Sequence, residues 1–449
     1  MTTRTLLRDG CVLSLGAKTP NLARADVLID GDRIAEVGQG LRARDAEVIE
    51  ATDAIVMPGF VDTHRHAWRS LFRNLGDPAS AALGGDGVGA VGELYGPDDL
   101  YAATLLSLLA AVEAGITTVV DRADLAVDAT SSEAVLRAHA DAGVRTVFVH
   151  VPRRTGDDDL SATRDLLPRL TAAAGPSTGI AFGSTVAATP DLDATSREWA
   201  AARELGLRIH AHVDPVTARP GAIAALAGAG LLGDDVTIVH PADLDEADLV
   251  ALSGHGAAVS MTPSSEMAGG AGSPPIQQLI DRDIRPGLGI DDEWMAPGDM
   301  FAQMRETISL QHATVFDRKL SGKAGLPRLM TTRDVIRFAT VDGARAAGVA
   351  GSAGSLAPGM QADVIVLRTD RPNVFPINDP IGAVVWGMDT SNVDRVFVAG
   401  RPLMREGVLE GDVERVRSLA IAARQRLAGA SGLVGTATPA GAPAARGGA

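Results

Sequence analysis

The feature that most constrains the fold is a series of eight short apolar segments with helical stretches, such as 100–114 and 132–142, between them. The first segment is 58–66, and the others follow in order at 117–121, 146–150, 180–184, 208–213, 236–240, 258–262 and 286–291. Repeated βα units of this number predict an α/β fold built on a (β/α)8 TIM-type barrel. An open doubly wound sheet is the alternative, but no glycine-rich dinucleotide fingerprint follows the first strand.

Both ends of the chain have a different character, with short strand-like segments and tight turns. Near the start, 26–29 and 33–37 flank the hairpin turn 30–32, and near the end, 362–367 and 393–398 are similarly strand-like. We therefore expect a small composite β-sandwich formed by both termini. The predicted organisation is sandwich (1–57), metal-binding barrel (58–358), sandwich (359–410), C-terminal helix (411–429) and disordered tail (430–449).

Composition narrows the class of protein. With 449 residues, 46% hydrophobic and 22% charged, the chain has an ordinary globular composition, and its net charge of -15 argues against nucleic acid or an anionic membrane as partner. The single cysteine, Cys11, excludes an intramolecular disulfide and a thiolate metal cluster. No apolar run is long enough to span a bilayer, and the first residues lack a signal-peptide core. We expect a cytoplasmic homodimer that acts on a small molecule.

Histidines gather at the ends of the predicted strands. On a strand, His64 and His66 point to one face and Arg65 to the other. In a (β/α)8 barrel, catalytic groups lie at the carboxyl ends of the strands. The fifth strand ends in His210 and His212, the sixth in His240 and the eighth in Asp291. Imidazoles and a carboxylate placed together suit a Zn²⁺ or Fe²⁺ site that keeps an open position for water.

These motifs resemble the amidohydrolase superfamily, in particular its cytosine deaminase and triazine hydrolase branch. The resemblance runs from about residue 5 to about residue 410. It is carried by Pro-Gly-Phe-Val-Asp-Thr-His-Arg-His at 58–66, Ile-His-Ala-His at 209–212, Ile-Val-His at 238–240 and Gly-Ile-Asp at 289–291. The segment 354–363 is similar to the family's return into its β domain.

The resemblance implies a ligand set for the metal. Its members are His64, His66, His212 and Asp291. His240 is either a further ligand or a group that polarises the substrate. The family pattern favours His212 over His210 as the ligand from strand 5, so we expect His210 to lie behind the ligands or in the core. Many relatives hold two metals bridged by a carboxylated lysine, but this chain has no lysine between Lys18 and Lys319. We therefore expect one divalent metal ion, Zn²⁺ in the first place and Fe²⁺ as the alternative.

The resemblance also implies the reaction. We expect a mononuclear metal-dependent hydrolase of a non-peptide C–N bond in a small heterocycle or cyclic amide, acting by deamination or ring opening. Asp291 would accept a proton from the attacking water, and His240 would stabilise the developing negative charge. Two alternatives are hydrolytic displacement of halide from a heteroaromatic ring and a metal-binding protein without turnover.

One departure from the family pattern concerns proton transfer. The deaminase branch usually has a glutamate three residues after the histidine of strand 5, and here that position is Pro215, preceded by Asp214. A proline side chain neither donates nor accepts a hydrogen bond. The acid is therefore absent, displaced to Asp214, or supplied by another carboxyl group, with Glu266, Asp292 and Asp121 as the candidates. We expect poor deamination of cytosine or guanine.

Two further features stand near the predicted strand ends. Several arginines follow strands 1 to 3, and we interpret them as ion-pair partners of Asp157, Asp158 and similar neighbours, with recognition of an anionic substrate as the alternative; they are Arg69, Arg73, Arg122, Arg153 and Arg154. The glycine-rich segment 69–96 is long for a loop, so we expect it to cover the active site and to move when substrate binds.

Overall fold

The computed structural model describes residues 4–74, 91–152, 157–186, 190–213, 219–269, 272–294 and 296–431. It contains two sheets, one of eight strands and one of nine. The eight-stranded sheet is a nearly closed parallel barrel, and the nine-stranded sheet is a separate mixed sheet drawn from both termini. The predicted fold class is thus confirmed.

The barrel strands follow one another in chain order, each parallel to the next. They are β6 (Phe60–Arg65), β7 (Ile116–Ala123), β8 (Arg145–His150), β9 (Thr178–Val186), β10 (Arg208–Val213), β11 (Val236–Val239), β12 (Ala258–Met261) and β13 (Gly287–Leu288). The ring closes just beyond β13, where Asp291 forms a parallel bridge with Arg65 of β6. Most strand residues are buried, as expected for parallel strands covered by helices.

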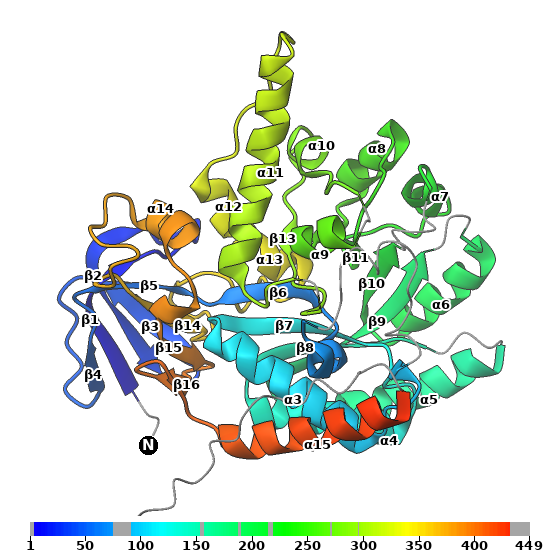
Figure 1. Ribbon diagram of the computed structural model, residues 1–449, viewed down its shortest axis with the longest axis horizontal. Helices are drawn as coiled ribbons and strands as arrows, with labels where there is room; N and C mark the ends of the chain where they lie inside the picture. The colour runs from blue at the N-terminus through cyan, green and yellow to red at the C-terminus, as the bar shows by residue number, and fades with distance from the viewer. Residues whose placement is uncertain are drawn as a thin grey trace, which may run out of the picture.

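Helices follow the strands and cover the outside of the barrel (Figure 1). The described α-helices of this layer are α3 (Pro97–Glu113), α4 (Ala129–Ala142), α5 (Asp157–Ala173), α6 (Leu192–Glu204), α7 (Ala222–Gly228), α8 (Glu246–His255), α9 (Pro263–Ala268), α10 (Ile276–Ile280), α11 (Met300–Leu320), α12 (Thr332–Phe338) and α13 (Val341–Ala346). Local sequence sets their ends. Asp128 caps α4 by accepting from the amide of Ser131, and Gly143 ends it in the left-handed region with φ 71°.

The nine-stranded sheet joins the two ends of the chain. Its N-terminal strands are β1 (Arg4–Val12), β2 (Leu22–Asp30), β3 (Arg33–Gly38), β4 (Glu47–Glu50) and β5 (Ala54–Pro58), and its C-terminal strands are β14 (Val364–Arg368), β15 (Val393–Val398), β16 (Arg401–Arg405) and β17 (Val408–Leu409). The two halves meet where β5 pairs antiparallel with β14, and the blue and orange strands lie side by side in Figure 1. Only Gly59 separates β5 from β6, so the sheet leads directly into the strand of the His-x-His motif.

The remaining helices lie near this junction and along the barrel. They comprise α14 (Pro380–Gly382), α15 (Val413–Ser431), the short turns η1 (Ala67–Phe72) and η3 (Thr390–Asn392), and the π-helical turn η2 (Ala383–Gly387). The last helix, α15, packs along α3 (Figure 1). The domain boundaries given above stay a prediction. Residues 75–90 of the proposed covering loop and 432–449 of the proposed tail lie outside the described residues.

One long helix was not predicted. Helix α11 has 21 residues and begins at Asp299, whose side chain accepts from the amide of Ala302. It projects from the body of the protein at the top of Figure 1. Phe316 and Leu320 near its far end are exposed, so this half lacks the alternation of apolar and polar faces by which a packed helix is recognised in a sequence.

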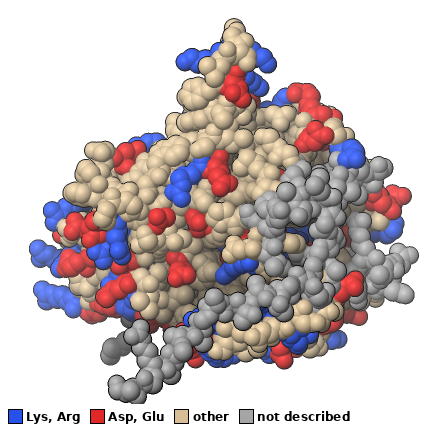
Figure 2. All heavy atoms as spheres, viewed as in Figure 1, with Lys and Arg blue, Asp and Glu red and all other residues tan. Residues whose placement is uncertain are grey.

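Charges of both signs are interspersed over the nine-stranded sheet on the face shown in Figure 2. Ion pairs join some of the charged residues of this sheet, such as Arg24 with Asp9 at 2.8 Å and Arg405 with Glu47 at 3.0 Å. Within the described part of the chain, none of the helices combines the length and the apolarity that crossing a bilayer requires.

A buried ion pair links the two sheets and gives a test of the fold. Arg145 of β8 donates to both carboxylate oxygens of Asp363, at 2.6 Å and 3.1 Å, and Asp363 also accepts from the amide of Ala399 at 2.8 Å. We expect Asp363→Ala to lower the free energy of unfolding by about 3–5 kcal/mol, because it leaves a buried guanidinium without its partner. Denaturant titration would measure this loss. Asp370→Ala, which removes an exposed partner of Arg368, is the control, and an equal effect of the two changes would contradict the prediction.

Candidate metal centre

The His-x-His segment is fixed by a carboxylate buried beneath it. Asp62 of β6 accepts from the amides of His64 and Ile290 through Oδ1, at 3.3 Å and 3.0 Å. Its other oxygen accepts from Nε of Arg65 at 2.6 Å, so Arg65 points away from the histidines as predicted. Burial raises the pKa of Asp62, although Arg65 opposes this.

The segment after β13 is held against the same strand by backbone hydrogen bonds. The amide of Asp291 donates to the carbonyl of His64 at 2.8 Å, and the amide of His66 donates to the carbonyl of Asp291 at 2.6 Å. Asp291 and His240 both have a positive φ, 66° and 54°, which is uncommon for residues other than glycine. Backbone strain of this kind persists where the surrounding structure enforces it and is typical of functional sites.

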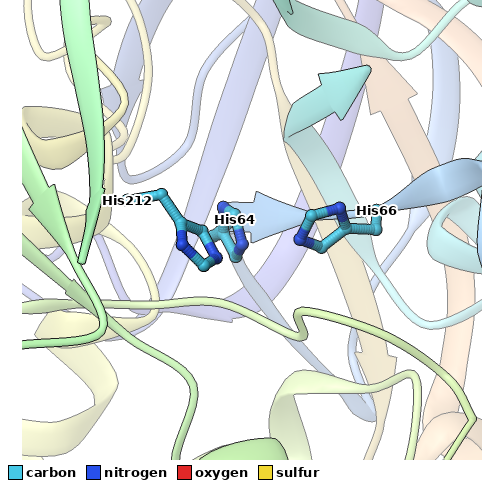
Figure 3. A group of neighbouring side chains, drawn as sticks. All are labelled: His64, His66 and His212. Atoms are coloured by element: carbon cyan, nitrogen blue, oxygen red, sulfur yellow. The ribbon is translucent and has the colours of Figure 1, made fainter. Parts of the chain in front are cut away.

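The potential ligand atoms converge on one carboxylate oxygen. Oδ1 of Asp291 lies 3.5 Å from Nε2 of His64, 3.4 Å from Nε2 of His66 and 3.8 Å from Nε2 of His240. His212 joins from β10, and Figure 3 shows its ring and that of His66 turned toward His64. Ligand atoms of His64, His66 and His212 lie within 4.8 Å of one another, as do those of His64, His240 and Asp291.

This arrangement fits a cation. Nε2 of His64 is buried and has no hydrogen-bond partner among the described residues. Burial lowers the pKa of His64 and of His212 well below the usual histidine value, and neutral imidazole is the form that binds metal. Although burial alone would raise the pKa of Asp291, His240 and the other histidines hold it well below its usual range. The site therefore offers neutral nitrogens and an ionised oxygen, the donor set of a divalent metal.

A cavity of about 480 Å³ opens beside these residues. Its lining includes the predicted site residues His66, His212, His240 and Asp291 and two of the candidate acids, Glu266 and Asp292. It also includes residues that we did not predict, among them Trp68, Asp124 and Ser265. The hydroxyl of Ser265 donates to Oδ2 of Asp291. A volume of this size suits a small-molecule ligand.

Two carboxylates hold histidines from behind. Glu266 accepts from Nδ1 of His240 through Oε1 at 3.0 Å, and the same oxygen accepts from the amide of Thr262 at 3.0 Å. Asp124 is 2.5 Å from Nδ1 of His66. Despite its burial, the contacts with His66 and Arg122 hold the pKa of Asp124 well below its usual range. The sequence position of Asp124, just after the second barrel strand, could have identified it as a candidate site residue.

The other candidate acids are already engaged. Asp292 accepts from Arg69 through Oδ2 at 2.8 Å and from the amide of Trp294 through Oδ1 at 3.0 Å. Asp121 is buried beside the core histidine His139, with Oδ2 2.9 Å from Nε2 of that ring. Its Oδ1 accepts from the amide next to His66 at 3.2 Å. Asp214 and Pro215 lie outside the described residues.

The three described arginines near the strand ends form ion pairs, as interpreted from the sequence, but with partners other than those named. Arg69 pairs with Asp292, Arg73 with Glu293 and Arg122 with Asp124. Arg69 and Arg122 also line the cavity, so these two pairs belong to the site rather than to the outer surface. Arg153 and Arg154, and the side chains of Asp157 and Asp158, lie outside the described residues.

His210 lies two residues before His212, deeper in the barrel. It pairs in register with Gly183 and Thr237 of the neighbouring strands and is buried. Burial lowers its pKa to about 3. Among the described residues, the groups of potential ligands include His212 and not His210.

Comparison with known proteins identifies the family. The Amidohydrolase family profile matches residues 55–403. The chain is 30% identical over 438 residues to 5'-deoxyadenosine deaminase of Methanothermobacter thermautotrophicus, a match that covers 91% of this chain and 96% of the relative. It is 28% identical over 419 residues to 5-methylthioadenosine/S-adenosylhomocysteine deaminase of Thermococcus kodakarensis, covering 89% and 93% of the two chains.

Two solved structures share the fold. An adenosine deaminase from Xanthomonas campestris with bound zinc superposes with a TM-score of 0.82 at 21% identity, covering 95% of this chain and 98% of the other. Atrazine chlorohydrolase of Arthrobacter aurescens complexed with zinc gives 0.81 at 22% identity, covering 94% and 100%. The chain belongs to the amidohydrolase family. The predicted class, a metal-dependent hydrolase of C–N bonds outside peptides, is confirmed at this level.

The close approach of Gly289 to β6 gives a test of the site geometry. A Cβ at Gly289 would lie 2.9 Å from both the amide nitrogen and the carbonyl oxygen of His64. These are backbone atoms and cannot step aside, so Gly289→Ala must displace the strand that carries the histidines. We expect a loss of roughly 1–3 kcal/mol in unfolding free energy, together with weaker metal binding.

The matched control is Gly254→Ala in helix α8, where a Cβ meets nothing within 4 Å. Alanine also favours the helix, so this variant should keep or slightly gain stability. Thermal denaturation and metal titration of both variants would decide. Normal metal affinity in Gly289→Ala would show that the contact with His64 does not set the geometry of the site.

Proposed function

We propose that this protein is a mononuclear metal-dependent hydrolase that cleaves the C–N bond to an exocyclic or ring nitrogen of a small heterocycle or cyclic amide. The observation that carries the proposal is the convergence of three histidine Nε2 atoms on Oδ1 of Asp291 at one wall of a 480 Å³ cavity. Such a site offers both a place for a metal and room for a ring-sized substrate beside it.

The proposed ligands are His64, His66, His212 and Asp291, with His240 as a fifth ligand or as a hydrogen-bonding partner of the substrate. We propose Zn²⁺, in keeping with the histidine-rich donor set and with the zinc bound in the two solved structures of this fold. One ion suffices, because the sequence has no lysine between Lys18 and Lys319 that could bridge a pair. Bound there, the metal would supply a Lewis acid and lower the pKa of a water molecule.

Two residues of the chain have separate roles in the proposed reaction: Asp291 accepts a proton, and His240 donates a hydrogen bond. Asp291 stays ionised and can accept a proton from water through Oδ1, while Ser265 occupies its Oδ2 and fixes the orientation of the carboxylate. The pKa of His240 is raised, since Asp291 and Glu266 outweigh the effect of burial, so this ring can donate a hydrogen bond to a developing negative charge.

Glu266 is the best placed of the described candidates for the missing acid. Its Oε1 is committed to His240 and Thr262, whereas Oε2 forms no hydrogen bond with another residue in the described part of the chain. The residue also lines the cavity. We keep Asp214 as the second candidate, because it stands next to Pro215 in the sequence.

The relatives at 28–30% identity favour deamination of a purine ring as the reaction to test first, since their names describe adenine nucleoside deaminases. The alternative reaction, displacement of halide from a heteroaromatic ring, is favoured by the fold shared with atrazine chlorohydrolase. A protein that binds the metal without turnover is the third possibility. In all three cases the partner is a small molecule, and a cytoplasmic homodimer remains our proposal for its location and assembly.

The metal content provides a direct prediction. The purified protein should hold about one Zn²⁺ per chain, because the described donors form one cluster around His64. His64→Ala and His66→Ala should be isolated without it. His312→Ala is the control, since His312 lies on helix α11 and its ring contacts the carbonyl of Met330 instead of the metal cluster. Elemental analysis that finds two tightly held ions in the wild type would rule out a mononuclear site.

The reaction is tested by ammonia release from a panel of adenine nucleosides, cytosine, guanine, cyclic amides and a chlorinated triazine, with chloride measured for the last. We expect Asp291→Asn to lower the turnover of any accepted substrate by about 10²–10⁴-fold, because an amide cannot accept the proton. Cytosine and guanine should be poor substrates, given Pro215. Near-normal activity of Asp291→Asn would remove this residue from its role as base. Fast cytosine turnover unaffected by Glu266→Gln or Asp214→Asn would show that the missing glutamate is not needed.

A further inference from the structure

Asp124 belongs to none of the sequence motifs, and the proposed reaction gives it no role. It follows β7 directly, and its Oδ2 is 2.5 Å from Nδ1 of His66. On the far side of the same ring, Nε2 of His66 lies 3.4 Å from Oδ1 of Asp291. The ring is therefore held between two carboxylates, one in the ligand cluster and one behind it.

We propose that Asp124 is a positioning residue for the metal centre, which accepts a hydrogen bond from Nδ1 of His66 and thereby directs the Nε2 lone pair at the metal. An imidazole that donates from Nδ1 is, when neutral, an acceptor at Nε2, so the contact selects the tautomer that can ligate. Partners of this kind fix ring orientation and raise the basicity of a ligand. The inference rests on the proposed function, because it assumes that His66 binds metal.

The carboxylate of Asp124 is itself fixed by Arg122 of β7 and Trp68 of η1. Nε of Arg122 donates to its Oδ1 at 2.8 Å, and the indole Nε1 of Trp68 lies 3.5 Å from its Oδ2. The guanidinium of Arg122 in turn donates to Oγ1 of Thr185 at 3.0 Å and to the carbonyl of Ser184 at 3.4 Å. The chain of contacts thus runs from β9 through the end of β7 to His66, the residue that follows β6.

His240 shows the same arrangement on the opposite side of the cluster. Glu266 accepts from its Nδ1 at 3.0 Å, while its Nε2 faces Oδ1 of Asp291 at 3.8 Å. Two histidines that follow different strands therefore each contact a carboxylate through Nδ1, and each has Nε2 facing Asp291. This repetition indicates that the contact between Asp124 and His66 belongs to the construction of the site.

The chemistry of an amide makes the test specific. The partners of Asp124 are all donors: Nδ1–H of His66, Nε–H of Arg122 and, at 3.5 Å, Nε1–H of Trp68. A carboxylate can accept from all of them. In Asp124→Asn the side chain has one accepting oxygen and one donating nitrogen. Either His66 or Arg122 then faces another donor, so His66 loses its orientation or Arg122 turns away.

The experiment measures Zn²⁺ affinity by competition with a chromophoric chelator. It adds the visible spectrum of the Co²⁺-loaded protein and the rise in melting temperature that Zn²⁺ produces over the metal-free form. We expect Asp124→Asn to bind Zn²⁺ about 10–100-fold more weakly and to show an altered Co²⁺ spectrum. Because the melting shift is taken relative to the metal-free form of each variant, a general loss of stability cancels. Asp141→Asn is the control: it removes the same charge from an aspartate on helix α4 that accepts from Tyr101.

Thr185→Val provides a second route to the same answer if Asp124→Asn does not fold. It removes one of the acceptors that hold Arg122 in place, at nearly constant shape, and we expect a smaller loss of Zn²⁺ affinity that still exceeds that of Asp141→Asn. Wild-type affinity and an unchanged Co²⁺ spectrum in Asp124→Asn, or in Thr185→Val where only that variant folds, would overturn the assignment. A wild-type protein that binds no Zn²⁺ would refute the proposed function and this inference with it.

Discussion

The site depends on the backbone hydrogen bonds that close the barrel between β6 and the segment after β13. The carbonyl of His64 accepts from the amides of Ile290 and Asp291, and the amide of His66 donates back to the carbonyl of Asp291. Asp62 completes this closure by accepting from the amides of His64 and Ile290. The same few bonds therefore shut the ring of strands and set three proposed ligands side by side. A change that opens the barrel at this seam also separates the ligands, so stability and metal binding are coupled here.

The carboxylates around the site differ in how their negative charge is balanced, and this difference favours a bound metal ion. Asp124, Asp292 and Glu293 each have an arginine partner, so their negative charges are balanced within the protein. Asp291 differs, since among the described residues its ion-pair contacts are with histidines alone. Burial keeps two of the neighbouring imidazoles, His64 and His212, in the neutral form. Neutral imidazoles do not balance the charge of a buried carboxylate, and a divalent ion bound between them would do so.

How far the sequence predicts this structure depends on whether a feature is periodic. The alternation of apolar strands and helices gives the barrel, and the placement of His64, His66, His212, His240 and Asp291 at strand ends follows from it, since the carboxyl ends of parallel strands share one face. Asp124 and Ser265 stand in no motif, and only the fold shows that they touch His66 and Asp291. Helix α11 was missed because an exposed half has no buried face to impose a pattern. The positive φ of His240 and Asp291 was also beyond prediction, because strain of this kind is imposed by the closed barrel and not by local preference.

The structure narrows the question left by Pro215. An acid that serves a substrate must keep an oxygen free on the side of the cavity. Asp121 uses one oxygen for His139 and the other for a backbone amide, and Asp292 uses its two oxygens for Arg69 and the amide of Trp294. Toward the other described residues, Glu266 uses Oε1 alone. It can thus orient His240 through one oxygen and contact a substrate with the other. A glutamate after strand 5 would make this second role unnecessary. The acid would then come from α9, after β12, instead of from the segment after β10, and the ring position that receives the proton would change with it.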